Sequence, residues 1–416
     1  MKETLELTAP PVERYRLVVV TSHPVQYQAP LFRQLARHPS IDLTVYYGND
    51  SSLANTVDPD FGIPVVWDRP LLDGYRSVFL THCTKPITKS SRLAAYSHII
   101  LDFCRNRYDA VFIHGYATPF SALAYLAAWI SRTPVLLRTE SELLRARATG
   151  LKVAKRLFLN LLFHGTAAFL VIGSANREFY MQHRVVWRKM YQTPYCVDND
   201  YFAAKCQELR PRRAELKQAL GFPPALPVIT FSGKLIERKR PMDLAMAYQQ
   251  LVEAGTSAGL LIIGEGRLRS ELEDFFAAQQ LPHVRLVGFK NQTELPECYV
   301  CGDVLVLPSA FETWGLVVNE GMLFGMPVIT TDMVGAARDL IENDVTGYVY
   351  PVGDVPGLAR LLQGLLSDPE KRLNMGGAAQ RRVSKLNYQA CVEGIVKALQ
   401  DIHDPHHLAR QEVPCG

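Results

Sequence analysis

Two glutamates, Glu312 and Glu320, stand among apolar and small residues with seven residues between them. If residues 316–324 form a helix, the neighbours of Glu320 three and four positions away are all apolar, so its carboxylate lies on an apolar face. Burying it alone would be costly, so Glu320 either has protein donors or receives a polar ligand. Glu312 lies in the loop after the apolar run 304–307, where open α/β sheets bind ligands. The pair predicts a site for a hydroxyl-rich molecule; a solvated loop residue and an ion-paired glutamate are the alternative.

A basic turn follows another apolar run, residues 228–232. It contains Gly233, Lys234 and Lys239 and ends at Pro241, which suits the first turn of a helix. Glycine lets a backbone approach a ligand closely, and two ammonium groups with helix-end amides could neutralise a diphosphate without a metal ion. An ordinary basic surface turn is the alternative.

Short aliphatic and β-branched runs alternate with helical stretches along the chain. Such runs are typical of parallel strands covered on both faces and joined by crossover helices. The predicted strands are residues 17–21, 43–47, 110–114, 134–138, 168–172, 228–232, 260–263, 284–288, 304–307 and 328–330. A proline-rich stretch, 208–227, predicts a linker. We therefore predict an α/β protein with two Rossmann-like domains, 1–207 and 228–385, a C-terminal helix and tail at 386–416, and a site in the cleft between the domains.

Size and charge agree with this division. A chain of 416 residues is too long for one core. Residues 1–200 carry 23 Lys and Arg against 16 Asp and Glu, a net charge of +7, whereas the remainder carries a net charge of −3. The first half therefore favours an anionic partner or surface.

The cysteines indicate a reduced protein. Of eight cysteines only Cys298 and Cys301 are close in sequence, and a single such pair is more typical of small buried residues than of a zinc site. Residues 1–6 have no apolar signal core, and the apolar run 157–173 is too short to span a bilayer. We expect a cytoplasmic protein with no metal and no cofactor.

Five motifs in the second half of the chain follow one another in a characteristic order. They are Gly233-Lys234 with Lys239, Gly264-Glu265-Gly266, Leu307-Pro308-Ser309, Glu312 with Glu320, and Gly325-Met326-Pro327. With these motifs, residues 228–352 resemble the nucleotide-sugar domain of retaining glycosyltransferase family 4, which has the GT-B architecture. The first half resembles the family more loosely, through residues 109–115, 171–174 and 194–202.

The resemblance implies a role for each matching residue. Lys234 and Lys239 would hold the diphosphate of the donor, and Glu320 the ribose hydroxyls. Glu312 would hold the hydroxyls of the transferred sugar, and His114 would lie beneath that sugar. The implied catalytic residues are His114, Glu312, Lys234 and Lys239; the implied donor-binding residues are Gly233, Lys234, Lys239, Gly264, Gly288, Phe289, Glu312, Trp314, Gly315, Leu316, Val317 and Glu320.

Three positions depart from the family pattern. The loop 23–28 lacks the paired glycines of many members, Glu140 stands where many have histidine, and Lys234 stands where many have arginine. A lysine holds phosphate as a point charge, without the bidentate fork of arginine.

The implied reaction is transfer of a hexose-type sugar from a nucleotide diphosphate sugar to the hydroxyl of a sugar or lipid-linked acceptor, with retention and without a metal. A front-face mechanism is implied, in which lysines and helix amides stabilise the leaving phosphate. We expect a role in cell-envelope polysaccharide or glycolipid synthesis and no nucleic-acid partner. A nucleotide-sugar epimerase and an inert sugar-nucleotide-binding protein are alternatives. Two Asp-x-Asp triplets, 58–60 and 198–200, match the metal motif of the other large glycosyltransferase fold, against which the two-domain pattern argues.

A basic amphipathic stretch at 143–158 offers a second kind of partner. Its charged residues, interleaved with apolar ones, are Arg145, Arg147, Lys152, Lys155 and Arg156. Such a stretch fits an anionic membrane surface, which would place the protein peripherally on the inner face of the membrane. A solvated helix face over the core fits the same pattern.

Overall fold

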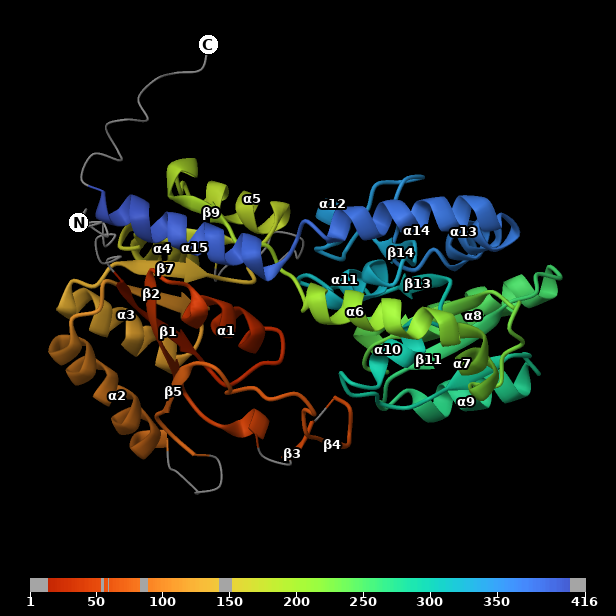
Figure 1. Ribbon diagram of the computed structural model, residues 1–416, viewed down its shortest axis with the longest axis horizontal. Coiled ribbons are helices and arrows are strands. Elements are labelled where there is room, and N and C mark those ends of the chain that lie inside the picture. Colours follow the sequence, from red (N-terminus) through yellow and green to blue (C-terminus); the bar gives the residue numbers. More distant parts are fainter. Residues whose placement is uncertain (1–13, 54–55, 59, 83–88, 142–151, 405–416) are drawn as a thin grey trace, which may run out of the picture.

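The structure, a computed structural model, describes residues 14–53, 56–58, 60–82, 89–141 and 152–404. They form two α/β domains that lie side by side along the long axis of the molecule (Figure 1). Each domain contains a parallel sheet with helices packed on both faces. The predicted fold class and the two Rossmann-like domains are confirmed.

The sheet of the N-terminal domain has seven parallel strands in the order β5-β2-β1-β6-β7-β8-β9. They are β1 (Tyr15–Thr21), β2 (Ile41–Tyr47), β5 (Arg76–Phe79), β6 (Ala110–His114), β7 (Val135–Arg138), β8 (Ala168–Val171) and β9 (Met190–Gln192). One face is covered by α2 (Lys89–Asn106), α3 (Pro119–Ser131), α4 (Lys152–His164) and α5 (Ser174–Gln182), the other by α1 (Ala29–Arg37) and α15 (Tyr388–His403). The strand order reverses at β1 and β6, which is where such sheets open to ligands.

The sheet of the C-terminal domain has six parallel strands in the order β12-β11-β10-β13-β14-β15. They are β10 (Val228–Ser232), β11 (Gly259–Ile263), β12 (Val284–Leu286), β13 (Val304–Leu307), β14 (Val328–Thr331) and β15 (Gly347–Tyr350). One face carries α8 (Pro241–Glu253), α9 (Arg269–Ala278) and α13 (Val355–Ser367); the other carries α6 (Asn199–Leu209), α7 (Arg213–Ala219), α10 (Leu295–Tyr299), α11 (Leu316–Leu323), α12 (Ala337–Leu340) and α14 (Pro369–Val383).

Strand β13 shows why the runs are continuously apolar. Val304 and Val306 pack in the core beneath α8 and α13, whereas Leu305 and Leu307 pack in the core beneath α6 and α11. Successive side chains point to opposite faces, so a strand buried on both faces needs apolar residues at every position.

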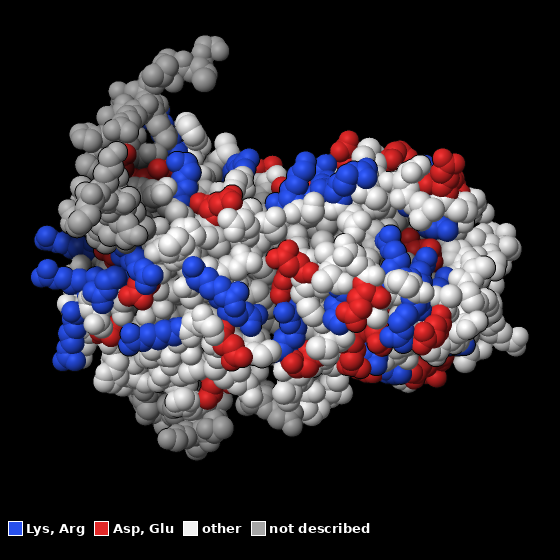
Figure 2. Space-filling view, viewed as in Figure 1, with Lys and Arg blue, Asp and Glu red and all other residues white. Residues whose placement is uncertain are grey.

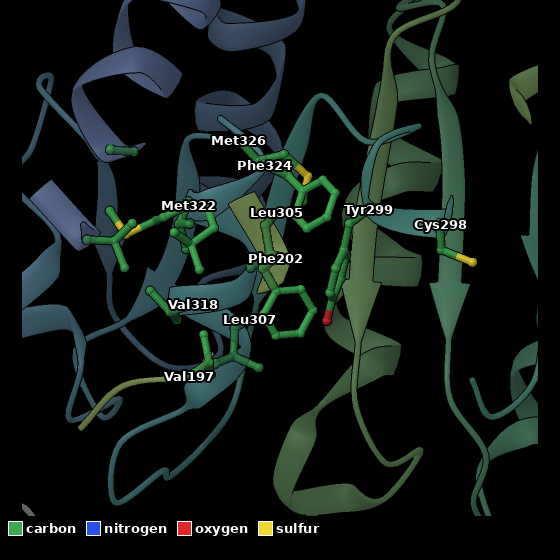
Figure 3. Packing of buried hydrophobic residues seen from close by; sticks show 14 of the residues in the cluster. Val197, Phe202, Cys298, Tyr299, Leu305, Leu307, Val318, Met322, Phe324 and Met326 are labelled. Atoms are coloured by element: carbon green, nitrogen blue, oxygen red, sulfur yellow. The ribbon is translucent and has the colours of Figure 1, made fainter. Parts of the chain in front are cut away.

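The chain connects the domains twice. After β9 it enters the C-terminal domain, where Phe202 of α6 packs among Leu305, Leu307 and Phe324 (Figure 3). The segment 208–227, predicted as a linker, contains α7 and adds residues to the same core. After α14 the chain returns, and α15 packs on the N-terminal sheet. The C-terminal core therefore includes residues that precede its first strand, and the N-terminal core includes a helix from the end of the chain.

A small hairpin lies apart from both sheets. Strands β3 (Thr56–Val57) and β4 (Pro64–Val65) pair only with each other among the described residues. They belong to the N-terminal domain, and their segment extends beneath the junction toward the C-terminal domain (Figure 1).

Candidate active site

A cavity of about 450 Å³ lies between the domains, at the carboxyl ends of their strands. From the predicted set it is lined by Gly233, Lys234, Lys239, Gly264, Phe289, Glu312, Trp314, Gly315, Leu316, Val317 and Glu320. His114 and Gly288 are not among its lining residues. The N-terminal domain contributes Gln26, Tyr27, Glu140 and Tyr195 to the wall, together with residues of the hairpin segment.

The first turn of α11 faces the cavity through its backbone. Gly315, at the N-cap, has φ of +95°, and its cap position makes no side-chain hydrogen bond. A Cβ at Gly315 would lie 3.1 Å from a methyl of Leu307. The first N–H groups of a helix have no intrahelical partner and carry the positive end of its dipole, so Leu316 and Val317 present an anion-binding surface to the cavity.

The two glycine turns after β10 and β11 pack against each other. Gly264 has φ of +145°, and a Cβ there would lie 1.9 Å from the carbonyl oxygen of Gly233. Gly288 supports the same turn, because its carbonyl accepts the Gly264 N–H at 2.8 Å. Only glycine permits this approach, which brings the backbone of both turns to the cavity wall.

Glu312 is buried and anchored by three neighbours. Its Oε1 lies 2.5 Å from Lys239 Nζ and accepts the Ser309 hydroxyl at 2.9 Å. Its Oε2 accepts from Arg238 Nη1 at 3.2 Å. Lys239 therefore joins the predicted sugar-binding carboxylate to the predicted diphosphate site.

Glu320 has one strong protein donor and a face toward the cavity. The Tyr299 hydroxyl donates to Glu320 Oε2 at 2.6 Å and also lies 2.9 Å from Ser232 Oγ. Burial raises the pKa of Glu320 to about 7, although Tyr299 and Lys239 act in the opposite direction. The sequence predicted either protein donors for Glu320 or a polar ligand. The structure shows a protein donor, and Glu320 also lines the cavity, where a ligand could reach it.

His114 reaches the cavity only through other residues. Its Nε2 lies 3.2 Å from Gln28 Nε2 and 3.6 Å from Glu140 Oε1. Glu140 also accepts hydrogen bonds from the hydroxyls of Tyr195 and Tyr27. Burial alone would raise the pKa of Glu140, but His114 and Tyr195 lower it to about 2. The side chain that faces the cavity here is thus an ionised carboxylate.

Lys234 is held by the hairpin of the other domain. Its Nζ lies 2.9 Å from Asp58 Oδ1 and 3.1 Å from Asp60 Oδ2. The two aspartates of the first Asp-x-Asp triplet therefore pair with a lysine that lines the cavity. In the second, Asp198 accepts the Tyr201 N–H at the start of α6 and pairs with Arg69 at 2.9 Å.

The described residues contain no group of three or more His, Cys, Asp or Glu placed to hold a metal ion. Cys298 and Cys301 are both buried, and the Cys301 thiol donates to the carbonyl of Glu297 at 3.2 Å. No described helix has the length and apolar character needed to cross a membrane.

Trp314 braces the junction of the domains. Its indole N–H donates to Asn319 Oδ1 at 2.8 Å, and its ring stacks on Tyr195 with 6.0 Å between centroids. Asn319 in turn donates to the backbone carbonyl of Tyr195 at 3.2 Å. Trp314, a predicted donor-binding residue, thus also couples the two walls of the cavity.

Sequence reasoning missed four wall residues, Phe61, Trp67, Tyr195 and Arg238, and also Tyr299, the buried donor to Glu320. Arg238 lies inside the basic turn, and its position could have been used to predict it, because a third cation beside Lys239 needs an anionic partner. The aromatic residues give no local signal, because their place depends on contacts such as Phe61 with Phe289, whose ring centroids are 5.1 Å apart across the domains.

Comparison with known proteins finds a family match in the C-terminal domain. Residues 212–382 match the family described as glycosyl transferases group 1. The alpha-D-kanosaminyltransferase of Streptomyces kanamyceticus is 26% identical over 238 residues, covering 57% of this chain and 60% of that protein. The sulfoquinovosyl transferase SQD2 of Arabidopsis thaliana is 33% identical over 175 residues, covering 41% of this chain and 33% of that protein.

These alignments span between a third and about 60% of the relatives' lengths. Likeness in three dimensions extends over both domains. Anabaena HepE, solved in complex with UDP, superposes with a TM-score of 0.71 at 16% identity, covering 93% of this chain and 99% of that chain. The chain therefore has the GT-B fold, and its residues 212–382 form a domain similar to the group 1 glycosyl transferases.

Proposed function

We propose that this protein is a retaining, metal-independent glycosyltransferase of family 4. It moves a hexose-type sugar from a nucleotide diphosphate sugar to the hydroxyl of a sugar or lipid-linked acceptor, in cell-envelope polysaccharide or glycolipid synthesis. The names of the relatives, a kanosaminyl- and a sulfoquinovosyl transferase, support sugar transfer, and the UDP complex of HepE supports a nucleotide donor.

One observation carries the proposal: a single cavity contains both carboxylates, Lys239 and the start of α11. Glu320 offers a carboxylate to a ribose diol. Glu312, held by Lys239, would contact the hydroxyls of the sugar of a bound donor. The start of α11 suits the diphosphate.

The state of the carboxylates supports a front-face reaction. Both oxygens of Glu312 are occupied by protein donors, which makes it a poor nucleophile. Glu140, with a pKa of about 2, is too weak a base to take a proton from an acceptor hydroxyl at neutral pH. A leaving phosphate, whose second pKa is about 6, is the stronger base.

Positive charge from the protein supports the metal-free part of the proposal. Lys239, Arg238 and the first amides of α11 meet where the diphosphate would lie. Such fixed donors stabilise the charge that develops on the leaving group, which is the role a metal has in other transferases.

The test starts with binding. UDP, GDP, ADP and TDP are screened by thermal shift with EDTA present, and a ligand at one hundred times its dissociation constant should add about 2.7 kcal/mol of stability. The sugar nucleotides of the winning base are then incubated with sugar and glycolipid acceptors, and the anomeric configuration of the product is read by proton NMR. Transfer with retention is expected. Epimerised sugar without acceptor, binding without turnover, or binding that EDTA abolishes would each contradict the proposal.

We place the acceptor at an anionic membrane, on the inner face of which the protein acts peripherally. Helices α3, α4 and α5 lie on one face of the N-terminal sheet, and large apolar side chains of α3, α4 and the short turn after α5 are exposed: Trp129, Ile130, Leu157, Phe158, Leu161 and Trp187. The helices are in contact near these residues: Gly165 approaches the Trp129 indole, and Asn160 bonds His183 at 3.2 Å.

The charge of this region fits an anionic surface. Residues 110–192 contain eleven Lys and Arg against three Asp and Glu. Of the three acids, Glu140 lies in the cavity and Glu178 pairs with Arg338. Lys and Arg gather at the end of the N-terminal domain that points away from the C-terminal domain (Figure 2). Apolar anchors among basic residues are the pattern of an interfacial surface. Most of the predicted stretch 143–158 lies outside the described residues; Arg156, Leu157 and Phe158 lie on this surface.

A further inference from the structure

The turn between β3 and β4 belongs to the N-terminal domain but contacts Lys234 of the C-terminal domain, a residue that lines the cavity. Three carboxylate oxygens face Lys234 Nζ: Asp58 Oδ1 at 2.9 Å, Asp58 Oδ2 at 3.1 Å and Asp60 Oδ2 at 3.1 Å. The Phe61 ring lies over the same ammonium, 4.8 Å from its nitrogen. An ammonium group has three donors, so the turn engages all that Lys234 can offer.

The segment after the turn is fastened to the C-terminal domain. Asn291 Nδ2 donates to the carbonyl of Val66 at 2.6 Å, and the Thr293 N–H donates to Asp68 Oδ2 at 2.9 Å. The Phe289 ring meets Phe61. The turn is thus held where it is by several contacts besides the ion pairs with Lys234.

This placement conflicts with a diphosphate at Lys234. Phosphate oxygens and carboxylate oxygens are acceptors for the same donors, and both are negative, so they repel each other at contact distance. Lys239 pairs with a carboxylate oxygen as well, Glu312 Oε1 at 2.5 Å, but the Glu312 carboxylate also accepts from Arg238 and Ser309. The region at α11 and Lys239 therefore has donors left for an anion, whereas the turn engages all three donors of Lys234.

We propose that Asp58 and Asp60 set the relative affinity for nucleoside diphosphates and monophosphates, by holding Lys234 until a second phosphate displaces them. The identity of the ligand rests on the proposed function. A nucleoside monophosphate has one phosphate, which α11 and Lys239 can satisfy, and nothing left to compete for Lys234. A nucleoside diphosphate anchored at α11 brings its other phosphate to Lys234 and exchanges with the two carboxylates. The turn thus lowers the affinity for the diphosphate and leaves the affinity for the monophosphate unaffected.

The experiment compares the affinities of UDP, GDP and ADP with those of UMP, GMP and AMP, measured by titration calorimetry in metal-free buffer. In the full-length Asp58→Asn/Asp60→Asn variant the preferred diphosphate should bind about five- to tenfold tighter, because partly exposed ion pairs of this kind no longer oppose it. The monophosphate should gain little, because it does not compete for Lys234, so the ratio of diphosphate to monophosphate affinity should rise. The control, Asp42→Asn/Asp73→Asn, removes the same charge from exposed positions of the same domain and should leave both affinities unchanged.

A second pair of variants tests whether the effect passes through Lys234. In a Lys234→Met background the two asparagine substitutions should change neither affinity, because the shared partner is gone. Unchanged affinities in the original background would overturn the proposal. So would weaker diphosphate binding that depends on Mn²⁺, since the carboxylates would then hold a metal. If none of the proteins binds a nucleotide, the proposed function fails first, and this proposal with it.

Discussion

The hydroxyl of Tyr299 donates to Glu320 Oε2 at 2.6 Å from a ring that is fully buried in the core of the C-terminal domain. Figure 3 shows this ring beside Phe324, with its oxygen at the edge of the cluster. Core packing thus fixes the donor, and the donor fixes the carboxylate of the predicted ribose site. Because the same burial raises the pKa of Glu320 to about 7, this site titrates near neutral pH.

Stability should depend on pH through Glu320. Its folded pKa lies above the unfolded value of 4.5, so the folded state holds the proton more tightly. The resulting stabilisation is full below pH 4.5 and is lost as pH rises to 7, at up to about 1.4 kcal/mol per pH unit. Urea unfolding at several pH values measures this, and Glu320→Gln should remove that part of the slope. An identical pH dependence in both proteins would contradict the assignment.

Nucleotide affinity should change in the opposite direction. A ribose diol donates to the carboxylate, so binding favours ionised Glu320, and the affinity for the preferred nucleoside diphosphate should rise about tenfold from pH 6 to pH 8. The terminal phosphate of the ligand titrates in the same range in every protein. The comparison with Glu320→Gln therefore isolates the glutamate: the variant should bind more weakly and show a flatter pH profile. Equal profiles would remove Glu320 from the ribose site.

The pair Lys239 and Glu312 should separate binding from turnover. Lys239→Met should mainly weaken donor binding, because a diphosphate contact exists before and during the reaction. Glu312→Gln should mainly lower kcat, because contacts to the departing sugar strengthen in the transition state. Steady-state kinetics of the two single variants and the double variant give the coupling free energy between the two side chains. We expect about 0.5–3 kcal/mol, because Lys239 Nζ lies 2.5 Å from Glu312 Oε1. Intact turnover in Glu312→Gln would reject its role.

The start of α11 should require glycine. Gly315→Ala places a Cβ at φ of +95° and 3.1 Å from Leu307, so we expect a loss of about 1–3 kcal/mol in unfolding free energy and weaker nucleotide binding. Gly364→Ala is the matched control, because this exposed glycine lies within α13 and a Cβ there meets nothing within 4 Å. It should stabilise by about 0.5–1 kcal/mol. Equal effects of the two substitutions would contradict this account.

Much of the fold is readable from local patterns. Strands 110–114, 228–232 and 304–307 were predicted with the bounds that the structure has, because each consists mainly of buried apolar residues. The helix predicted to start at 316 also forms, as α11, and places Glu320 as the pattern implies.

The missed elements share a physical reason. Strands β3 and β4 have two residues each, and β4 begins with a proline, so neither strand is long enough to show an alternating pattern. Strand β5 is partly exposed at the sheet edge and lacks the continuous apolar run of a buried strand. The ion pairs of Lys234 with Asp58 and Asp60 join residues about 175 positions apart, and only the placement of the domains brings them together.

Binding to lipid vesicles should require both the apolar and the basic parts of the N-terminal surface. Each Lys or Arg near an anionic membrane contributes about 1 kcal/mol and is screened by salt, so binding to phosphatidylserine vesicles should fall steeply between 50 and about 300 mM salt, and neutral vesicles should bind poorly. Arg132→Gln/Arg156→Gln/Arg184→Gln should weaken binding, as should Leu161→Ser/Trp187→Ser, while nucleotide binding at the far cavity stays unchanged.

The controls are Arg360→Gln/Arg381→Gln/Lys385→Gln, with the same loss of charge, and Leu373→Ser, an equally exposed leucine of the C-terminal domain. Vesicle flotation measures all of them. Salt-independent binding, or equal loss in controls and variants, would move the acceptor from the membrane to a dissolved molecule.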